Sequence, residues 1–581
     1  IAGAGSGKTR VLTARIAYMI EQGVAPFNIL ALTFTNKAAR EMRERIEQLV
    51  PDGRARYIWM GTFHSVFYRI LRQEAGRLGF DANFTIYDTA NSESLLSTII
   101  KERNLNTDEY KPRDIHSRIS LAKNNLVTAE AYAANTSFVA EDRQRKRPEF
   151  SAIFLEYARR CKANNAMDFD DLLIYANILF RDFPDALEQY RNRFRYILVD
   201  EYQDTNYAQY LIVRRLAQTH SNVCVVGDDD QSIYRFRGAT IENILSFEEQ
   251  YHKAKVIRLE QNYRSTQNIL DAANAVISHN TERKGKNLWT ANGPGEKIVV
   301  DNAFDEQEES TFIADTIMDS VKGGRKWSDH AVLYRMNAQS NAIERTFVRM
   351  GVPYRVIGGH RFYERKEIRD ALAYLSVISN PADNIRLRRI INEPKRGIGA
   401  TTINHAAQIA AGLGLSLYEV ISHADEYEQL VRAAPRLRAF TQIIDGLAEA
   451  AEELPLNELF EKAMRDTGYL DSLALDRETY QDRLENIQEL SSNLLRYSED
   501  NEEGDLNGFL EEVALMTDID NYNEEADTVV LMTLHSAKGL EFPVVFIPGM
   551  ERGIFPGIQS LYSASEMEEE RRLAYVGITR A

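Results

Sequence analysis

The chain has 581 residues, of which 44% are hydrophobic and 27% charged, and its 70 Lys and Arg against 86 Asp and Glu give a net charge of −16. This length suggests about three to five globular domains, and the composition is that of a folded protein, which excludes a disordered or fibrous chain. Apolar runs stay well short of the roughly 20 residues that span a bilayer, and the two cysteines, Cys161 and Cys224, are too few and too distant for a disulfide framework or a cysteine zinc site. We therefore expect a cytoplasmic protein without a membrane partner. The net negative charge does not exclude nucleic acid as a partner, because affinity for phosphate depends on where the positive charges lie.

In chain order, six short apolar runs are predicted to be buried parallel strands, each followed by a polar or glycine-containing turn. They are residues 29–34, 196–199, 223–226, 256–259, 331–334 and 544–547. Two long stretches, from residue 88 to about 183 and from about 364 to 518, have a charged, amphipathic helical pattern instead and no comparable strand. The sequence thus predicts an α/β fold that two helical insertions interrupt.

The two ends of the chain lie inside recognisable motifs. The chain begins within a glycine-rich loop, with only Ile1 left of the buried strand that normally precedes such a loop, and it stops at Ala581 directly after an arginine. We expect the natural protein to be longer at both ends.

The first motif is a phosphate-binding loop. Ala2-x-x-x-x-Gly7-Lys8-Thr9 matches the Walker A spacing, with Ala in place of the first Gly. Its glycines let successive N–H groups and a helix N-terminus point at phosphate oxygens, while Lys8 would neutralise the β- and γ-phosphates and Thr9 would bind Mg²⁺. A glycine-rich turn before a helix is the alternative. The residues predicted to surround the phosphates are Ala2, Gly3, Ala4, Gly5, Ser6, Gly7, Lys8 and Thr9.

A Walker B segment strengthens the prediction. The apolar run 196–199 ends in Asp200 and Glu201. Asp200 suits magnesium binding, and Glu201 suits the general base that polarises an attacking water. Together with the phosphate loop, these carboxylates predict hydrolysis of a nucleoside triphosphate.

Further segments separate this chain from a generic phosphate-loop protein. Residues 226–238, 259–266, 533–542 and 571–580 combine amides, aromatic rings and arginines in a fixed order. Together with residues 32–39, 61–65, 199–204, 361–368 and 396–399, they resemble the superfamily 1A DNA helicases of the UvrD/Rep/PcrA type, with the PcrA-like members as the best match. The resemblance covers essentially the whole chain.

The resemblance implies two RecA-like parallel-sheet motor domains with ATP between them, each carrying a mainly helical insertion domain. Motor domain 1A would comprise residues 1–87 and 184–266, and its insertion 1B residues 88–183. Motor domain 2A would comprise residues 267–363 and 519–581, and its insertion 2B residues 364–518.

The resemblance also assigns roles around the nucleotide. Gln231 would sense the γ-phosphate, and Arg264 and Arg580 would be arginine fingers, which can be worth about 10³–10⁵ in rate. Tyr263 would stack on adenine with Arg10 nearby. We expect base selectivity to rest here on these two residues alone, because the family's glutamine motif would stand upstream of the first residue given. Glu541, beside Gly539, would hold the ribose. Gln203 and His535 would couple the nucleotide to DNA, although core packing or turn structure is the alternative for the Tyr and His residues. The predicted catalytic set is Lys8, Asp200, Glu201, Gln231, Arg264 and Arg580.

Single-stranded DNA needs aromatic platforms and a cationic groove. Phe34, Tyr234 and Phe236 would stack on bases, although Phe236 stands where the family usually has Trp, and core burial is the alternative for an isolated Phe. Gly397, Gly399 and Thr401 open a predicted helix and would bind a duplex phosphate, with an ordinary capped turn as the alternative. The basic run 143–147 suits a solvated loop better than a duplex contact. The remaining predicted DNA contacts are Asn36, Lys37, Thr62, His64, Arg335 and His535.

The resemblance implies an ATP- and Mg²⁺-dependent DNA helicase that moves 3′ to 5′ on single-stranded DNA, unwinds duplex at single/double-strand junctions and acts in DNA repair or replication. We expect a monomer or weak dimer in the bacterial cytoplasm, associated with the nucleoid, with repair or transcription proteins bound through tails outside this sequence. One alternative is a translocase that displaces proteins from DNA with little unwinding, and another is a translocase-nuclease of the RecB or AddA type. An RNA helicase is disfavoured by motif type.

Overall fold

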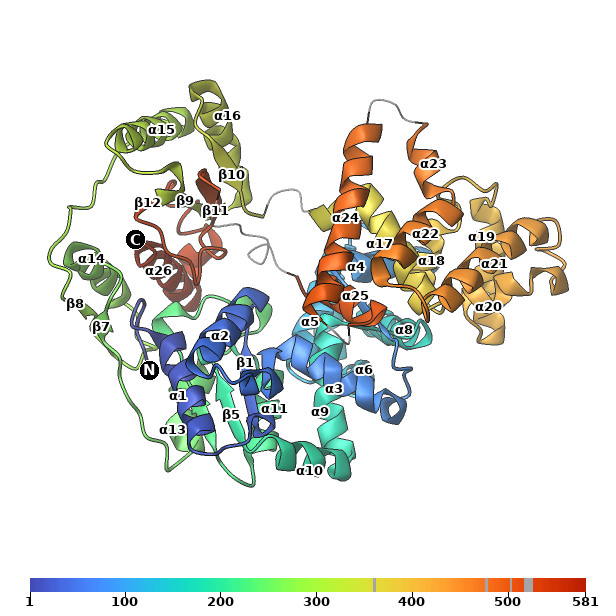
Figure 1. Ribbon diagram of the computed structural model, residues 1–581, viewed down its shortest axis with the longest axis horizontal. Helices are drawn as coiled ribbons and strands as arrows, with labels where there is room; N and C mark the ends of the chain where they lie inside the picture. The colour runs from blue at the N-terminus through green and yellow to red at the C-terminus, as the bar shows by residue number, and fades with distance from the viewer. Residues whose placement is uncertain (359–361, 476–478, 502–503, 517–525) are drawn as a thin grey trace. The chain divides into compact units, whose positions relative to one another are not determined.

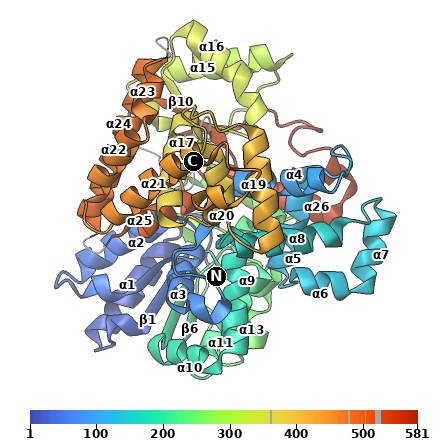
Figure 2. The same cartoon turned by 90° about the vertical axis from the view of Figure 1, so that its right-hand side faces the viewer.

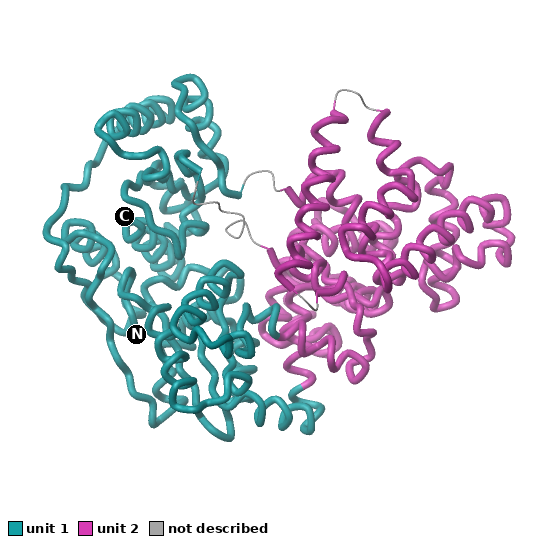
Figure 3. The backbone as a smooth tube through the Cα atoms, viewed as in Figure 1, with its two compact units in different colours: residues 1–66, 180–359, 517–581 teal, residues 67–179, 360–516 magenta. Residues whose placement is uncertain are grey.

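The computed structural model describes residues 1–358, 362–475, 479–501, 504–516 and 526–581. The chain forms two compact units, each assembled from separate stretches of sequence (Figure 3). Unit 1 comprises residues 1–66, 180–359 and 517–581, and unit 2 comprises residues 67–179 and 360–516. The finer division into four domains stays a prediction, and Arg361, which opens the 361–368 motif, lies outside the described residues. Among the described helices, none combines the length and the apolar character needed to cross a bilayer.

Unit 1 contains two four-stranded parallel sheets, so the predicted α/β fold is confirmed. The first has the order β2-β1-β5-β6, with β1 (Ile29–Thr33), β2 (Trp59–Thr62), β5 (Tyr196–Val199) and β6 (Val223–Val225). The second has the order β10-β11-β9-β12, with β9 (His330–Tyr334), β10 (Tyr354–Val356), β11 (Val529–Thr533) and β12 (Val544–Phe546). Every residue of β1 and β9 is buried, as expected where helices cover both faces of a parallel sheet.

Strand register brings the ends of the first sheet into line. Leu32 of β1 is paired with Val199 of β5, and Thr33 with Thr62 of β2. The turns that follow these strands therefore share one edge of the sheet, the edge where ligands bind in open parallel sheets. The helices of unit 1 are α1 (Lys8–Glu21), α2 (Asn36–Leu49), α10 (Pro184–Arg193), α11 (Tyr207–Ala217), α12 (Glu242–Leu245), α13 (Phe247–Gln250), α14 (Gln267–Ile277), α15 (Glu306–Lys322), α16 (Ser340–Met350) and α26 (Ala564–Ile578) (Figure 1).

One of the six predicted strands is wrong. Residues 256–259 make only an isolated bridge, between Leu259 and Ala2, and Ile257 is largely exposed. The backbone of this run bonds with the first residues of the chain: Ile1 N donates to Ile257 O (2.8 Å), Leu259 N–H donates to Ile1 O (2.9 Å) and Gly3 N–H donates to Leu259 O (3.0 Å). This pairing is too short to make a strand. Three strands of the two large sheets, β2, β10 and β11, lie outside the predicted runs, and so does a two-stranded parallel sheet of β7 (Gln261–Asn262) and β8 (Trp289–Thr290).

Unit 2 is mainly helical. Helix α17 (Lys366–Ser379) lies against α21 (Ala434–Ala450), α22 (Leu456–Asp466) and α24 (Tyr480–Asp500), as Figure 2 shows from a second side, and Tyr374, Leu459 and Leu490 are fully buried there. The insertion 88–183, predicted without strands, contains β4 (Ala166–Asp168), which is paired in parallel with β3 (Thr85–Tyr87). The other helices, two of which extend into unit 1, are α3 (Phe63–Leu78), α4 (Thr89–Glu102), α5 (Pro112–Asn124), α6 (Ala129–Ala134), α7 (Thr136–Gln144), α8 (Phe150–Ala163), α9 (Phe169–Asp182), α18 (Asn384–Ile390), α19 (Ala400–Leu413), α20 (Leu417–Ser422), α23 (Tyr469–Leu473) and α25 (Leu506–Leu515).

Candidate nucleotide and nucleic-acid site

The glycine-rich loop continues the first sheet and leads directly into α1. Ala2 N–H donates to Gly227 O, just after β6, at 2.9 Å. Gly7 has φ 85° and provides no side-chain cap for α1, and Gly5 has φ 61°, a region that favours glycine. A Cβ on Gly3 would lie 2.0 Å from Leu288 Cδ2. Backbone conformation and packing thus both require glycine, and the first N–H groups of α1 have the arrangement that binds phosphate.

The carboxylates after β5 face the start of α1. Lys8 Nζ lies 3.3 Å from Glu201 Oε1, and Thr9 Oγ1 donates to Asp200 Oδ2 at 3.2 Å. Glu201 has φ 49°, a left-handed conformation that costs a non-glycine residue about 1–3 kcal/mol and is concentrated at functional sites. The predicted Walker A and Walker B residues are therefore brought together.

Burial and neighbouring charges shift the pKa values of the two carboxyl groups in opposite directions. Burial and the charge of Glu201 raise the pKa of Asp200 to about 7. Burial also acts on Glu201, but the ammonium groups of Lys8 and Lys538 and the hydrogen bond from Gln203 outweigh it and lower the pKa of Glu201 to about 2. Glu201 is thus ionised at neutral pH, as a general base must be.

The same geometry suits a magnesium ion. A hydroxyl and a carboxylate oxygen, the ligand types that Mg²⁺ prefers, are adjacent in Thr9 and Asp200. The raised pKa of Asp200 reflects a buried negative charge without enough compensation, and a divalent cation would supply that compensation. The residues present therefore fit this ion.

The turn after residue 259 packs directly on the phosphate loop. Tyr263 N–H donates to Gly5 O (3.0 Å), and the Tyr263 side chain is 67% exposed. Asn262, to which the sequence analysis gave no role, holds this turn: its Nδ2 donates to Ala4 O (2.8 Å), and its Oδ1 accepts from Arg264 N–H (2.8 Å). The aromatic ring predicted to stack on adenine thus lies open beside the loop, and Arg10 is exposed on α1.

The two predicted arginine fingers are far apart in the sequence and lie near each other. Arg264 Nε donates to Glu541 Oε2 (2.6 Å), and its Nη1 donates to Thr579 O (3.1 Å). Arg580 is 2% exposed and donates to the carbonyls of Val576 (2.9 Å) and Leu540 (3.1 Å). Burial and the charge of Arg264 lower the pKa of Arg580 to about 9, while Glu201 acts in the opposite direction. Gly539, with φ 89°, is exposed two residues before Glu541.

A chain of short hydrogen bonds connects Glu201 with Gln231. Gln203 Nε2 donates to Glu201 Oε2 (2.6 Å), and Gln203 Oε1 accepts from Asp228 N–H (2.9 Å). Gln231 Nε2 donates to Asp228 Oδ2 (2.6 Å). All four side chains come from turns after β5 and β6, so Gln203 and Gln231 lie where coupling to the hydrolysis site is physically possible.

Lys538 is a site residue to which the sequence analysis gave no role. It follows β11 of the second sheet, and its ammonium group forms an ion pair with Asp204 and donates to Gln231 O (2.7 Å). The ammonium group also lies 3.9 Å from Glu201 Oε2 and 5.2 Å from the centre of the Tyr234 ring. Its position directly before Gly539, inside a recognised motif, was the available signal. Its partners could not be read from a linear pattern.

Aromatic rings gather beside Lys538. Tyr234 Oη donates to His535 O (3.3 Å), and the rings of Phe236 and His535 are 5.3 Å apart. Phe236 is 65% exposed, so its face is open to a base, whereas Phe34 is half-buried and packs 5.6 Å from Phe63. Burial and the positive charge of Arg335 lower the pKa of His535 to about 3, which keeps the imidazole neutral.

The predicted polar DNA contacts lie on several elements and have different partners. Burial and the charge of Arg237 lower the pKa of His64 to about 4, which places His64 near the arginine beside Phe236. Arg335 forms an ion pair with Glu570 (2.9 Å), which offsets its charge, and Thr62 Oγ1 accepts from Ser65 N–H (3.1 Å) at the start of α3. Asn36 and Lys37 open α2 directly after the β1 turn.

The predicted duplex contact belongs to unit 2. Gly399 precedes α19 without a side-chain cap, Gly397 has φ 68°, and Gly397, Gly399 and Thr401 are exposed, as a phosphate-binding turn requires. In the basic run 143–147, Arg145 is paired with Glu141 (2.7 Å) and Arg147 with Asp114 (3.0 Å), so part of its charge is neutralised.

Comparisons with known proteins show the family of this chain. Residues 1–252 match the UvrD/REP helicase N-terminal domain, and residues 257–581 match the UvrD-like helicase C-terminal domain. The chain is 49% identical over 590 residues to the ATP-dependent DNA helicase PcrA of Bacillus subtilis (strain 168), with 100% of this chain and 79% of that protein covered. Identity to the PcrA helicases of Staphylococcus epidermidis and Staphylococcus aureus is 47% and 46%, with the same coverage. This chain belongs to the UvrD/REP helicase family.

Proposed function

We propose that this protein is an ATP-dependent DNA helicase that moves 3′ to 5′ on single-stranded DNA and opens duplex at junctions. The observation that carries the proposal is the arrangement around Lys8. Glu201 is 3.3 Å from Lys8, and Asp200 is hydrogen-bonded to Thr9. The charges of Arg264 and Glu201 both act on Arg580. The names of the bacterial relatives, ATP-dependent DNA helicases, support the same activity.

In this proposal, Lys8 and the N–H groups at the start of α1 bind the β- and γ-phosphates. Before ATP arrives, Lys8 and Glu201 neutralise each other, and the polyphosphate competes for Lys8, which frees the Glu201 carboxylate to polarise water. Thr9 and Asp200 would hold Mg²⁺, which withdraws charge from the phosphate oxygens. Arg264 and Arg580 stabilise the charge that develops on the transferred phosphoryl group.

The contacts of Lys538 support coupling between hydrolysis and DNA. Its ammonium group touches Asp204 and Gln231 on the side of the first sheet, and its own loop carries His535, whose ring packs against the exposed Phe236. A shift of the second sheet relative to the first therefore moves the base-stacking surface and the hydrolysis site together. Such a shift on ATP binding, reversed after hydrolysis, would advance the chain along one DNA strand in the nucleoid of a bacterial cell.

The first experiment measures ATP hydrolysis with and without single-stranded DNA in the presence of Mg²⁺. We expect strong stimulation by DNA in the natural chain and none in Glu201→Gln, which keeps the size of the side chain and removes its basicity. Equal rates with and without DNA would refute a DNA-driven motor.

The second experiment compares unwinding of 3′-tailed, 5′-tailed and blunt duplexes, with displacement of streptavidin from biotinylated single strands as a parallel assay. We expect unwinding of the 3′-tailed duplex only. Streptavidin displacement without unwinding would favour a protein-displacing translocase, and preference for the 5′ tail would refute the proposed polarity.

A further inference from the structure

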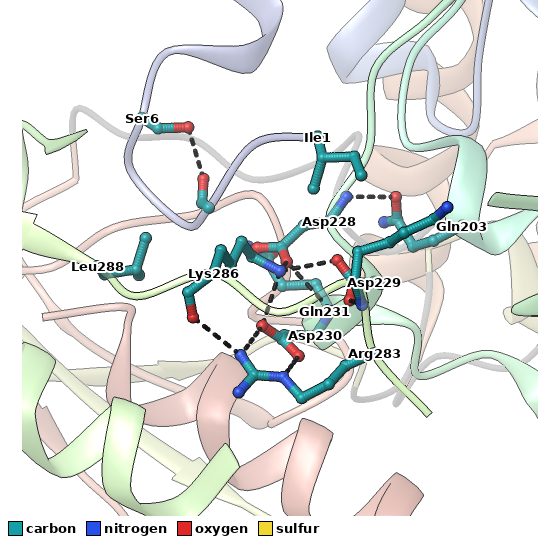
Figure 4. Close-up of polar contacts among 12 residues, drawn as sticks. Ile1, Ser6, Gln203, Asp228, Asp229, Asp230, Gln231, Arg283, Lys286 and Leu288 are labelled. Atoms are coloured by element: carbon teal, nitrogen blue, oxygen red, sulfur yellow. Dashed lines mark hydrogen bonds and ion pairs between the residues drawn. The ribbon is translucent and has the colours of Figure 1, made fainter. Parts of the chain in front are cut away.

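The side chain of Lys286 is enclosed by three consecutive aspartates. Its Nζ lies 2.6 Å from Asp228 Oδ1, 2.8 Å from Asp229 Oδ1 and 2.7 Å from Asp230 Oδ2 (Figure 4). Oxygens of the three carboxylates lie within 4.8 Å of one another, a spacing that could hold a metal ion. The ammonium group, whose side chain is 2% exposed, fills this position, so the cation of the cluster is supplied by the chain itself.

Asp228 differs from Asp229 and Asp230 in the second group that its carboxylate binds. Asp229 accepts from Lys284 N–H (2.7 Å), and Asp230 binds the guanidinium of Arg283 (2.7 Å). The second oxygen of Asp228 instead accepts from Gln231 Nε2 at 2.6 Å. Lys286, Asp228 and Gln231 therefore form one continuous, buried, charge-assisted connection, and such bonds are about twice as strong as neutral ones.

Lys286 belongs to a segment that ties three functional elements together. We call residues 280–288 the strap. At one end, Asn280 Nδ2 donates to Glu568 O (2.9 Å) and Thr281 N–H donates to Glu568 Oε1 (2.8 Å), which fastens the strap to α26, the helix that precedes Arg580. At the other end, Leu288 fills the space against Gly3 of the phosphate loop.

We propose that Lys286 is a positioning residue for Gln231: by fixing the Asp228 carboxylate, it holds the Gln231 amide to the strap and thereby to α26. The proposal rests on the proposed function, in which Gln231 faces the γ-phosphate. The orientation of Gln231 then depends on the position of α26 and of Arg580 just beyond it, because the strap connects α26 with Asp228. Burial acts against the charge of Lys286, but the three carboxylates outweigh it and raise its pKa well above the ordinary value, so the ammonium group keeps its charge at every working pH.

A double-mutant cycle tests this connection, because residues that act through each other are not additive. The steady-state ATPase with saturating single-stranded DNA is measured for Lys286→Met, Gln231→Ala and the double variant. We expect Lys286→Met to lower kcat about tenfold with KM for ATP changed less than about twofold. In the Gln231→Ala background, the same change should cost less than about twofold. Full additivity would overturn the proposal, as would a loss from Lys286→Met when Gln231→Ala alone has no effect, or no loss from Lys286→Met.

Arg283→Gln is the matched control, because Arg283 places a cation in the same cluster but binds Asp230 and the backbone carbonyl of Lys286 (3.2 Å) rather than Asp228. We expect its kcat to stay within about threefold of the parent, and a loss equal to that of Lys286→Met would overturn the proposal. If Lys286→Met does not fold, Lys286→Met with Asp229→Asn, which removes one charge of each sign, replaces it in the cycle. Failure of both to fold would show that Lys286 is required for folding rather than for positioning Gln231. A parent chain without DNA-stimulated hydrolysis would instead refute the proposed function itself.

Discussion

Replacing Lys538 by Met should destabilise the protein in a way that depends on pH. The Lys538 side chain is 7% exposed, and its ammonium group forms an ion pair with the buried carboxylate of Asp204. Lys538→Met keeps the length of the side chain and removes its charge. Breaking a buried ion pair by removing one partner usually costs about 3–5 kcal/mol, because the remaining charge is left unpaired. Asp204 can limit that cost by binding a proton.

The magnitude follows from the pKa of Asp204. Burial, opposed by Lys538, raises that pKa from 3.8 to about 6. Between these two values the folded state binds more protons than the unfolded state, so stability falls as pH rises, and the fall ends once pH exceeds the folded pKa. Without Lys538 the pKa of Asp204 in the folded state rises further, so the free energy of unfolding keeps falling to a higher pH. The additional loss from Asp204 is therefore at most about 0.4 kcal/mol at pH 6, about 1.4 kcal/mol at pH 7 and about 2.7 kcal/mol at pH 8, the values reached when the pKa of Asp204 without Lys538 lies above that pH range.

Urea unfolding at pH 6, 7 and 8, followed by circular dichroism, measures this difference. The control is Lys538→Met introduced into an Asp204→Asn background, where position 204 cannot ionise and the loss should be the same at each pH. A loss in the parent background that does not grow between pH 6 and pH 8 would refute the reasoning.

Three further predictions concern single residues. Glu201→Gln should keep nucleotide affinity but lower turnover by about 10²–10⁴-fold, measured by nucleotide titration and phosphate release, and unchanged turnover would remove Glu201 as the base. Phe236→Trp should tighten single-stranded DNA binding by about 1 kcal/mol, since a larger exposed ring stacks more strongly; fluorescence anisotropy at fixed salt tests this, and weaker binding would contradict it. His64 stays neutral in the folded state down to pH about 4, whereas the unfolded imidazole binds a proton below 6.5, so this residue should cost the parent about 2 kcal/mol at pH 5. His64→Gln should accordingly lose less melting temperature between pH 7 and pH 5, and an equal loss would show that His64 does not have this effect.

The phosphate loop and its carboxylates could be predicted because each is a contiguous pattern. Lys8 and Thr9 are fixed by the helix that starts at position 8, and Asp200 and Glu201 by the strand before them, so local sequence determines their geometry. The pairing of Arg264 with Glu541 spans 277 residues, and only a resemblance to a known family suggested that these two positions would meet.

Lys538 and Lys286 show where sequence reasoning stops. A single lysine in a loop has no periodicity, and its partners are far along the chain: Lys286 is 57 residues from Asp229, and Lys538 is 334 residues from Asp204. The wrong strand at residues 256–259 has a similar cause, because an apolar run becomes a strand only where a neighbouring segment pairs with it. The small strand β4 escaped prediction because its three residues lie among helices.

The division of each unit into separate stretches has a consequence for synthesis on the ribosome. Tyr87 Oη, fully buried in unit 2, donates to Asp383 Oδ1 at 2.9 Å, and these residues are 296 positions apart. At about 5–20 residues per second, Asp383 is made about 15–60 s after Tyr87. During that interval the first part of unit 2 exists without its later half, so its apolar surface is exposed to chaperones. Newly made chains should therefore depend on chaperone protection most strongly before residue 516 has left the ribosome.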